Sequence, residues 1–309
     1  MKIRNTFTKE ELEKYPELGK KNNLFALKYI LNRITRGKNA LILTYGVTGS
    51  GKSWLDIRIA ELLCIVQGRK FDIANRIFFD FKGLLTYTNQ KDLPPGDVSV
   101  SEELGVSMGA RKWQRNISYS ELLQTFRDLQ TICLFNVPFR TMIDKHARLL
   151  SHFQIEMMSR KGNLNTIKLF LLQHNPSAKT DKKTTFEKYL RIERTNKWGS
   201  IIKKPIKVLR WKQPSKEVLD IYIPLQKEFK SNVRKRLAAK VKEGEAKENS
   251  KSNVIDKIEI NDKEIRRLKD NGLTVKEISS AKHIHPATTY RSLERTRNSQ
   301  EKSQIPNKK

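Results

Sequence analysis

The sequence predicts an α/β domain with a mainly parallel sheet flanked by helices, followed by a small all-α domain. Short apolar runs alternate with segments of helical periodicity between residues 39 and 173, as in parallel strands joined by helices. From about residue 214 this alternation stops, and long charged segments lead to three short helical patterns at the C-terminal end. A change of pattern of this kind indicates a second, separate module.

The elements follow from periodicity and from helix and turn signals. After the first apolar strand, Leu55, Ile59 and Leu62 recur at helical spacing until Gly68. Helices are expected at 9–36, 82–89, 120–129, 142–153 and 217–242, strands at 39–45, 76–81, 98–101, 131–137, 154–158 and 166–173, and a linker at 243–253.

Three domain-level segments are expected: an α/β domain over 1–232, a basic helix and linker over 233–254, and a helical domain with a flexible tail over 255–309. Lys and Arg number 62 against 33 Asp and Glu, a net charge of +29. The excess is uneven, with 24 basic and 15 acidic residues in 1–150 but 38 and 18 in 151–309. This favours a polyanionic partner, either nucleic acid or an anionic membrane face, over a merely solvated surface.

The two cysteines, Cys64 and Cys133, lie in apolar stretches, which favours buried free thiols and a reducing compartment. No apolar segment follows the first residues, and no apolar run approaches the ~20 residues that span a bilayer. We therefore expect a cytoplasmic protein without a transmembrane segment, with peripheral membrane docking as an alternative.

A glycine-rich loop follows the strand at 39–45. It matches the spacing G-x-x-x-x-G-K-S in full: Gly46, Val47, Thr48, Gly49, Ser50, Gly51, Lys52 and Ser53. Such a loop turns backbone N–H groups toward phosphates, and the next helix adds the positive end of its dipole. Lys52 is expected to reach the β- and γ-phosphates of ATP, and Ser53 to bind Mg²⁺. A chance glycine turn is the alternative, but the strand before and helix after supply the required context.

Hydrolysis needs acidic groups at the end of a neighbouring strand. Glu102 and Glu103 follow the strand at 98–101. Glu102 is expected at the metal, through water, and Glu103 as the catalytic base. Glu102 stands where Asp is usual, which leaves slow turnover open; Asp97 is a rival at the other end of the strand. Alternatively, both glutamates open a surface loop.

Two further kinds of residue are candidates for sensing or stabilising the γ-phosphate. Asn136 ends the strand at 131–137, although it also suits a turn before Pro138. Arginine-finger candidates are Arg111, Arg115, Arg127 and Arg148. Arg127 and Arg148 are preferred because they lie on helices predicted beside the sheet.

Several segments resemble a group of P-loop ATPases from archaeal viruses, plasmids and integrated elements, labelled zonular-occludens-toxin-like or FtsK–HerA-like. The likeness spans about residues 22–232. It is carried by residues 46–53, the strand leading into Glu103-Leu-Gly-Val, Gln124-Thr-Phe-Arg, Ile143-Asp-Lys-His-Ala-Arg and 212–229. The resemblance implies a P-loop NTPase fold with a catalytic glutamate on an additional strand, a homo-oligomeric ring, commonly a hexamer, and work on double-stranded DNA.

The C-terminal segment predicts three short helices, at 262–270, 274–282 and 285–296. Asn271-Gly272 supplies a helix stop, Thr274 with Glu277 a capping box, and Pro286 a helix start. The pattern is a helix-turn-helix, and 272–278 with 288–291 resembles the C-terminal domain of resolvases and invertases.

If this module binds DNA, its third helix lies in the major groove. The expected contacts are Lys276, Ala287, Thr288, Thr289, Arg291 and Arg295. A protein-docking bundle is the alternative.

Together these features predict a Mg²⁺-dependent ATPase that translocates, packages or transfers DNA of a mobile genetic element. The alternative is a nucleotide-switched DNA-binding regulator, partition or replication-initiation protein with slow turnover.

Overall fold

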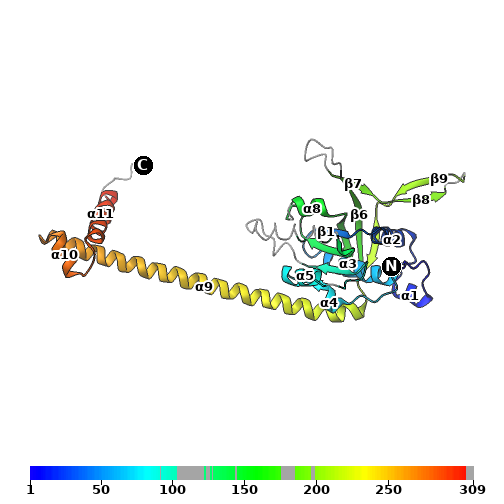
Figure 1. Cartoon of the computed structure of the whole chain (residues 1–309), viewed down its shortest axis with the longest axis horizontal. Helices are drawn as coiled ribbons and strands as arrows, with labels where there is room; N and C mark the ends of the chain where they lie inside the picture. Colours follow the sequence, from blue (N-terminus) through cyan, green and yellow to red (C-terminus); the bar gives the residue numbers. More distant parts are fainter. Residues whose placement is uncertain are drawn as a thin grey trace. The chain divides into compact units, whose positions relative to one another are not determined.

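The computed structural model describes residues 1–90, 92–102, 122, 126, 128–142, 145–174, 185–195 and 199–303 (Figure 1). Its contacts divide the chain into two compact units, Met1–Phe229 and Lys230–Lys309. Within the described residues, no helix is both long and apolar enough to cross a bilayer.

The first unit is built on an eight-stranded sheet of order β10-β6-β5-β1-β4-β3-β2, with β7 also paired to β6. The parallel strands are β1 (Ala40–Tyr45), β2 (Ile77–Phe78), β3 (Val98–Ser101), β4 (Ile132–Val137) and β5 (Phe153–Lys161). The antiparallel edge consists of β6 (Leu164–His174), β7 (Thr185–Tyr189) and β10 (Leu209–Lys212). This mixed α/β sheet is mostly parallel, as predicted, and is compatible with a P-loop NTPase-like fold.

Helices cover both faces of the sheet, because successive side chains of a strand point to opposite faces. Ala40 and Ile42 of β1 pack with α2 (Lys21–Thr35) and α3 (Lys52–Val66). Leu41 and Leu43 pack on the other side, with α5 (Phe81–Thr88) and with Leu122 and Phe126. Burial on both faces explains why β1 reads as an uninterrupted apolar run.

The remaining elements of the first unit are short. They comprise α1 (Lys9–Lys14), α4 (Ile73–Arg76), the 3-10 turn η1 (Arg140–Met142), α8 (Lys145–Leu150), and the ribbon of β8 (Arg191–Thr195) and β9 (Ile201–Pro205). Figure 1 shows the ribbon projecting beyond the large sheet. Cys64 and Cys133 are free and buried, as expected.

Two predicted elements of the first unit differ from the structure. The strand expected at 76–81 is reduced to β2, because Asp80 caps α5 through a bond from the Gly83 N–H. Of the helix expected at 142–153, the described part is α8, and β5 already begins at Phe153. β5 and β6 form an antiparallel hairpin that turns at Gly162, whose φ is +56°. Most of the helix expected at 120–129 lies outside the described residues.

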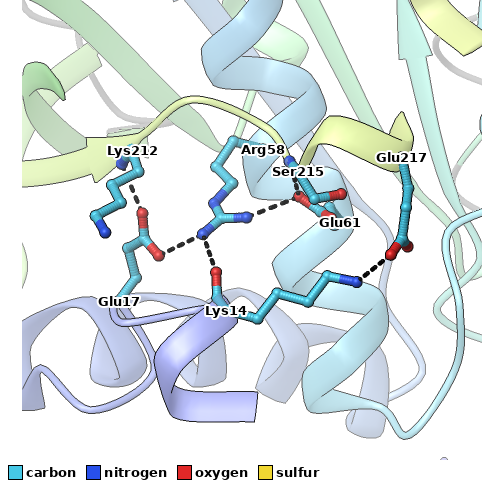
Figure 2. Close-up of polar contacts among 7 residues, drawn as sticks. All are labelled: Lys14, Glu17, Arg58, Glu61, Lys212, Ser215 and Glu217. Atoms are coloured by element: carbon cyan, nitrogen blue, oxygen red, sulfur yellow. Dashed lines mark hydrogen bonds and ion pairs between the residues drawn. The ribbon is translucent and has the colours of Figure 1, made fainter. Parts of the chain in front are cut away.

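A buried ionic network ties the helix that follows the glycine-rich loop to two distant segments (Figure 2). Arg58 of α3 donates to Glu17 at 2.7 Å and to Glu61 at 2.9 Å, and all three side chains are almost fully buried. The Lys212 N–H donates to Glu17, and the Ser215 N–H donates to Glu61. The two carboxylates therefore each receive a backbone donor in addition to the shared guanidinium.

The second unit contains most of α9 (Lys216–Asp270), together with α10 (Val275–Ala281) and α11 (Pro286–Ser303). Gly272 ends α9 in the left-handed conformation at φ +89°, and the predicted Thr274–Glu277 capping box is present. Residues 243–253, predicted as a linker, are helical within α9. Three Glu, two Lys and one Ala among these eleven residues are good helix formers, so low apolar content alone did not identify a linker.

Candidate functional site

The loop at 46–53 connects the carboxyl end of β1 to the first turn of α3. Gly51 precedes α3 at φ +92°, a conformation that disfavours other residues. A Cβ on Gly46 would lie 2.6 Å from the Cβ of Met157 on β5, which is closer than two carbons can approach. The glycines are therefore required by backbone conformation and by the packing of β5 against the loop.

Lys52 folds back over the loop. Its Nζ donates to the carbonyl oxygens of Gly46 at 2.7 Å and Val47 at 3.0 Å. Burial lowers the pKa of Lys52, while the charges of Asp56 and Glu102 oppose that shift. The ammonium is thus held at the loop, close to two carboxylates.

Asp56 is a site residue that sequence reasoning missed. It lies one turn after Lys52 and is fully buried. Thr44 Oγ1 of β1 donates to its Oδ1 at 2.5 Å, and Asn136 Nδ2 of β4 donates to its Oδ2 at 3.2 Å. The pKa of Asp56 is raised to about 8, mainly by burial and also by the charge of Glu102, although the hydrogen bonds from Thr44 and Asn136 and the charge of Lys52 lower it. Its acidic side chain between the apolar Leu55 and Ile57 was the available signal.

Glu102 follows β3 and is 1% exposed. Its backbone N–H donates to the Phe78 carbonyl at 2.8 Å. Its charge raises the pKa of both Lys52 and Asp56. Glu103, the expected catalytic base, lies outside the described residues.

The donor set fits a hard divalent cation. Ser53, in the first turn of α3, and Glu102 both offer oxygen ligands, which Mg²⁺ prefers. Ser50 Oγ is buried in the loop without a hydrogen-bond partner among the described residues. A buried hydroxyl of this kind suits a loop that is completed by a polar ligand.

Arg160 of β5 is a second residue that the sequence did not single out. Its guanidinium carbon lies 4.5 Å from the centroid of the Trp54 ring, which follows the loop. A Cβ on Gly51 would lie 3.1 Å from Arg160 Cδ and 3.1 Å from Asn165 Oδ1. Asn165 is 1% exposed, and its Oδ1 lacks a hydrogen-bond partner within the described part of the chain. The β5–β6 hairpin thus places a cation and an amide beside the loop.

Of the residues expected to sense the γ-phosphate, Asn136 lies near the loop, whereas Arg148 has no described contact with it. Asn136 lies in β4 in register with Thr44, and its amide is directed at Asp56 beneath the loop. Arg148 lies in α8, where its carbonyl accepts from Ser151, and no described contact joins its side chain to the loop. Arg127 and the other two candidates, Arg111 and Arg115, lie outside the described residues.

In the second unit, Lys276, Ala287, Thr288 and Arg291 are exposed, as DNA contacts must be. Thr289 is different: it is fully buried, with its hydroxyl 2.8 Å from that of Ser279. Thr289 thus packs α11 against α10, and its predicted DNA contact does not fit this position.

Arg295 lies on the same helix and also has an internal role. It binds Asp262 of α9 with two hydrogen bonds, of 2.8 and 3.0 Å. Tyr290 is 63% exposed between Thr289 and Arg291 and was not predicted as a contact.

Comparison with known proteins finds likenesses among solved structures. No protein-family model and no curated protein matches the chain. Among solved structures, it is similar to the N-terminal domain of zonular occludens toxin from Neisseria meningitidis, with 17% identity and a TM-score of 0.35. The match covers 59% of this chain and 98% of that domain. A likeness of this size carries no argument about activity.

Proposed function

We propose that the first unit binds Mg²⁺-ATP at residues 46–53 and hydrolyses it. The observation that carries this proposal is the loop itself: a complete phosphate-binding spacing between a buried parallel strand and a buried helix, with Lys52 held over it. Backbone N–H groups of the loop and the first turn of α3 would hold the phosphates, and Lys52 would neutralise them. Bound Mg²⁺ supplies charge neutralisation of the phosphate oxygens.

The residues around the loop have distinct proposed roles. Ser53 and Glu102 would hold the metal, with Glu102 acting through water, and Glu103 would accept the proton of the attacking water. Asp56 would position Thr44 and Asn136 beneath the loop, because its carboxylate accepts from both. Arg160 would add a positive charge beside the phosphates from within the same chain.

We further propose that the second unit binds duplex DNA as a helix-turn-helix, with α11 in the major groove. The support is the end of α9 followed by the short, capped helix α10 and by α11, where Ala287, Thr288 and Arg291 are exposed. A homo-oligomeric ring acting on DNA of a mobile element remains part of this proposal. One observation supports the alternative, a nucleotide switch with slow turnover: Glu102 has a longer side chain than the Asp that is usual at the metal position.

The test is steady-state ATP turnover by the full chain, measured with and without duplex DNA. We expect turnover that duplex DNA stimulates and that Lys52→Ala and Glu103→Gln abolish. Lys38→Ala is the matched control, because Lys38 is exposed near the opposite end of β1. Sequence-specific DNA binding with negligible turnover would instead favour the switch, and absence of nucleotide binding would overturn both.

A further inference from the structure

Two adjoining hollows in the first unit have strongly cationic linings, remote in sequence from the glycine-rich loop. The larger, about 660 Å³, lies along α2, β7 and the β8–β9 ribbon. Its cations are Lys21, Lys28, Lys188, Arg191 and Lys203. Its acid is Glu193, which forms an ion pair with Lys203 at 3.5 Å.

The smaller hollow, about 560 Å³, shares Lys21 with the larger one and adds Lys20, Arg194 and Arg210. Together the two linings hold eight basic residues and one acidic residue. Across the whole chain that ratio is 62 to 33, about two to one. The cationic character of this surface therefore exceeds what the composition of the chain supplies. We call it the α2–ribbon surface.

The ribbon is anchored firmly enough to present these charges. Ile192 of β8 is 5% exposed and belongs to the core. Arg194 donates to Asn22 Oδ1 at 3.0 Å, and Lys28 donates to Asn5 Oδ1 at 2.6 Å. Both acceptors are neutral amides, so these contacts order the two cations without cancelling their charge.

We propose that the α2–ribbon surface binds the phosphodiester backbone of duplex DNA. The cations are spread over two hollows that share Lys21, as contact with the repeated phosphates of a duplex backbone requires. A two-stranded ribbon of this size also fits the DNA major groove. In the proposed function, the named DNA contacts all belong to the second unit. This inference adds a DNA-binding surface on the first unit, and it rests on the proposed function only in taking DNA as the partner.

The test compares duplex DNA binding by the full chain and by the triple variant Lys21→Gln, Lys188→Gln, Lys203→Gln. Fluorescence anisotropy is measured at several salt concentrations. Each phosphate contact contributes about 0.9 to the slope of log K against log salt. We expect the triple variant to have a slope smaller by about 2 to 3 and at least roughly tenfold weaker binding at low salt.

The matched control is Lys9→Gln, Lys70→Gln, Lys82→Gln, which removes the same charge from exposed positions elsewhere in the first unit. Equal affinity and slope for the two triple variants would overturn the proposal, as would a wild-type chain that does not bind duplex DNA. Loss of binding to phosphatidylserine vesicles with unchanged DNA binding would assign the surface to lipid instead. ATP binding is measured on the same samples, so a failure of the nucleotide site is seen separately.

Discussion

The buried network around Arg58 makes a quantitative prediction about stability. Replacing Arg58 with Ala leaves Glu17 and Glu61 buried without their shared cation, each retaining a backbone donor, from Lys212 and Ser215 respectively. Removing one partner from a buried ionic group costs about 3–5 kcal/mol, mainly because the remaining charge is uncompensated. Against a typical domain stability of about 5–15 kcal/mol, this is a large fraction.

The assay is urea unfolding of the full chain, followed by tryptophan fluorescence. Trp54 and Trp211 report on the first unit, where Trp211 is 2% exposed. We expect Arg58→Ala to lower the free energy of unfolding by about 3–5 kcal/mol near neutral pH.

Lys14→Ala is the control in the same region. Lys14 pairs with Glu217 at 2.7 Å, but their side chains are 41% and 64% exposed. An exposed pair is worth at most about 1 kcal/mol, so this variant should be close to wild type. Figure 2 shows both pairs within one view. If Arg58→Ala were no more destabilising than Lys14→Ala, the assignment of the network to fold stability would be wrong.

Three further predictions concern the two proposed sites. The pKa of Asp56 is raised from 3.8 to about 8, so its stabilising protonated state is lost as pH rises through that range. Without nucleotide or metal, Asp56→Asn should therefore gain stability relative to wild type from pH 5 to 8, by about 1.4 kcal/mol per pH unit; a pH-independent difference in urea unfolding would contradict this. Arg160→Ala should weaken ATP binding about 10-fold or more in calorimetry, as loss of a charge-assisted contact predicts, while Arg148→Ala should not. Thr289→Val should lower the free energy of unfolding by about 1–2 kcal/mol, because Ser279 loses its buried partner, and should leave the affinity for duplex DNA unchanged. Arg291→Ala should weaken duplex binding and leave the stability unchanged. Weaker duplex binding by Thr289→Val at unchanged stability would instead place Thr289 in the DNA contact.

Features that depend on neighbouring residues were predictable from the sequence. The strand, loop and helix at 40–66 were expected because an apolar run, a glycine spacing and a helical period occur in immediate succession. The Thr274–Glu277 box and the Gly272 stop likewise depend on residues within a single turn. In each case the interacting groups are a few positions apart in the chain, so a short sequence pattern is enough to predict the interaction.

Features that depend on long-range packing were missed. Asp56 becomes a site residue only because β1 and β4 bring Thr44 and Asn136 beneath the loop. Arg160 lies beside Gly51 only through the β5–β6 hairpin, about a hundred residues further along the chain. Neither juxtaposition leaves a local pattern.

Burial of polar residues was also missed. Thr289 looked like a surface residue because threonine is usually exposed. Its partner Ser279 lies on another helix, and their hydrogen bond is what allows both to be buried.

Equilibrium binding of Mg²⁺-ATP tests the central claim most directly, because every nucleotide-dependent role proposed here requires it. The measurement is calorimetry on the wild-type chain, Lys52→Ala and Lys38→Ala. Lys52 would contribute a charge-assisted contact worth about 1.5–3 kcal/mol, so Lys52→Ala should bind roughly 10- to 100-fold more weakly. Lys38→Ala should bind as the wild type does. Equal binding by all three proteins, or none by the wild type, would contradict the assignment of residues 46–53 as a phosphate-binding loop.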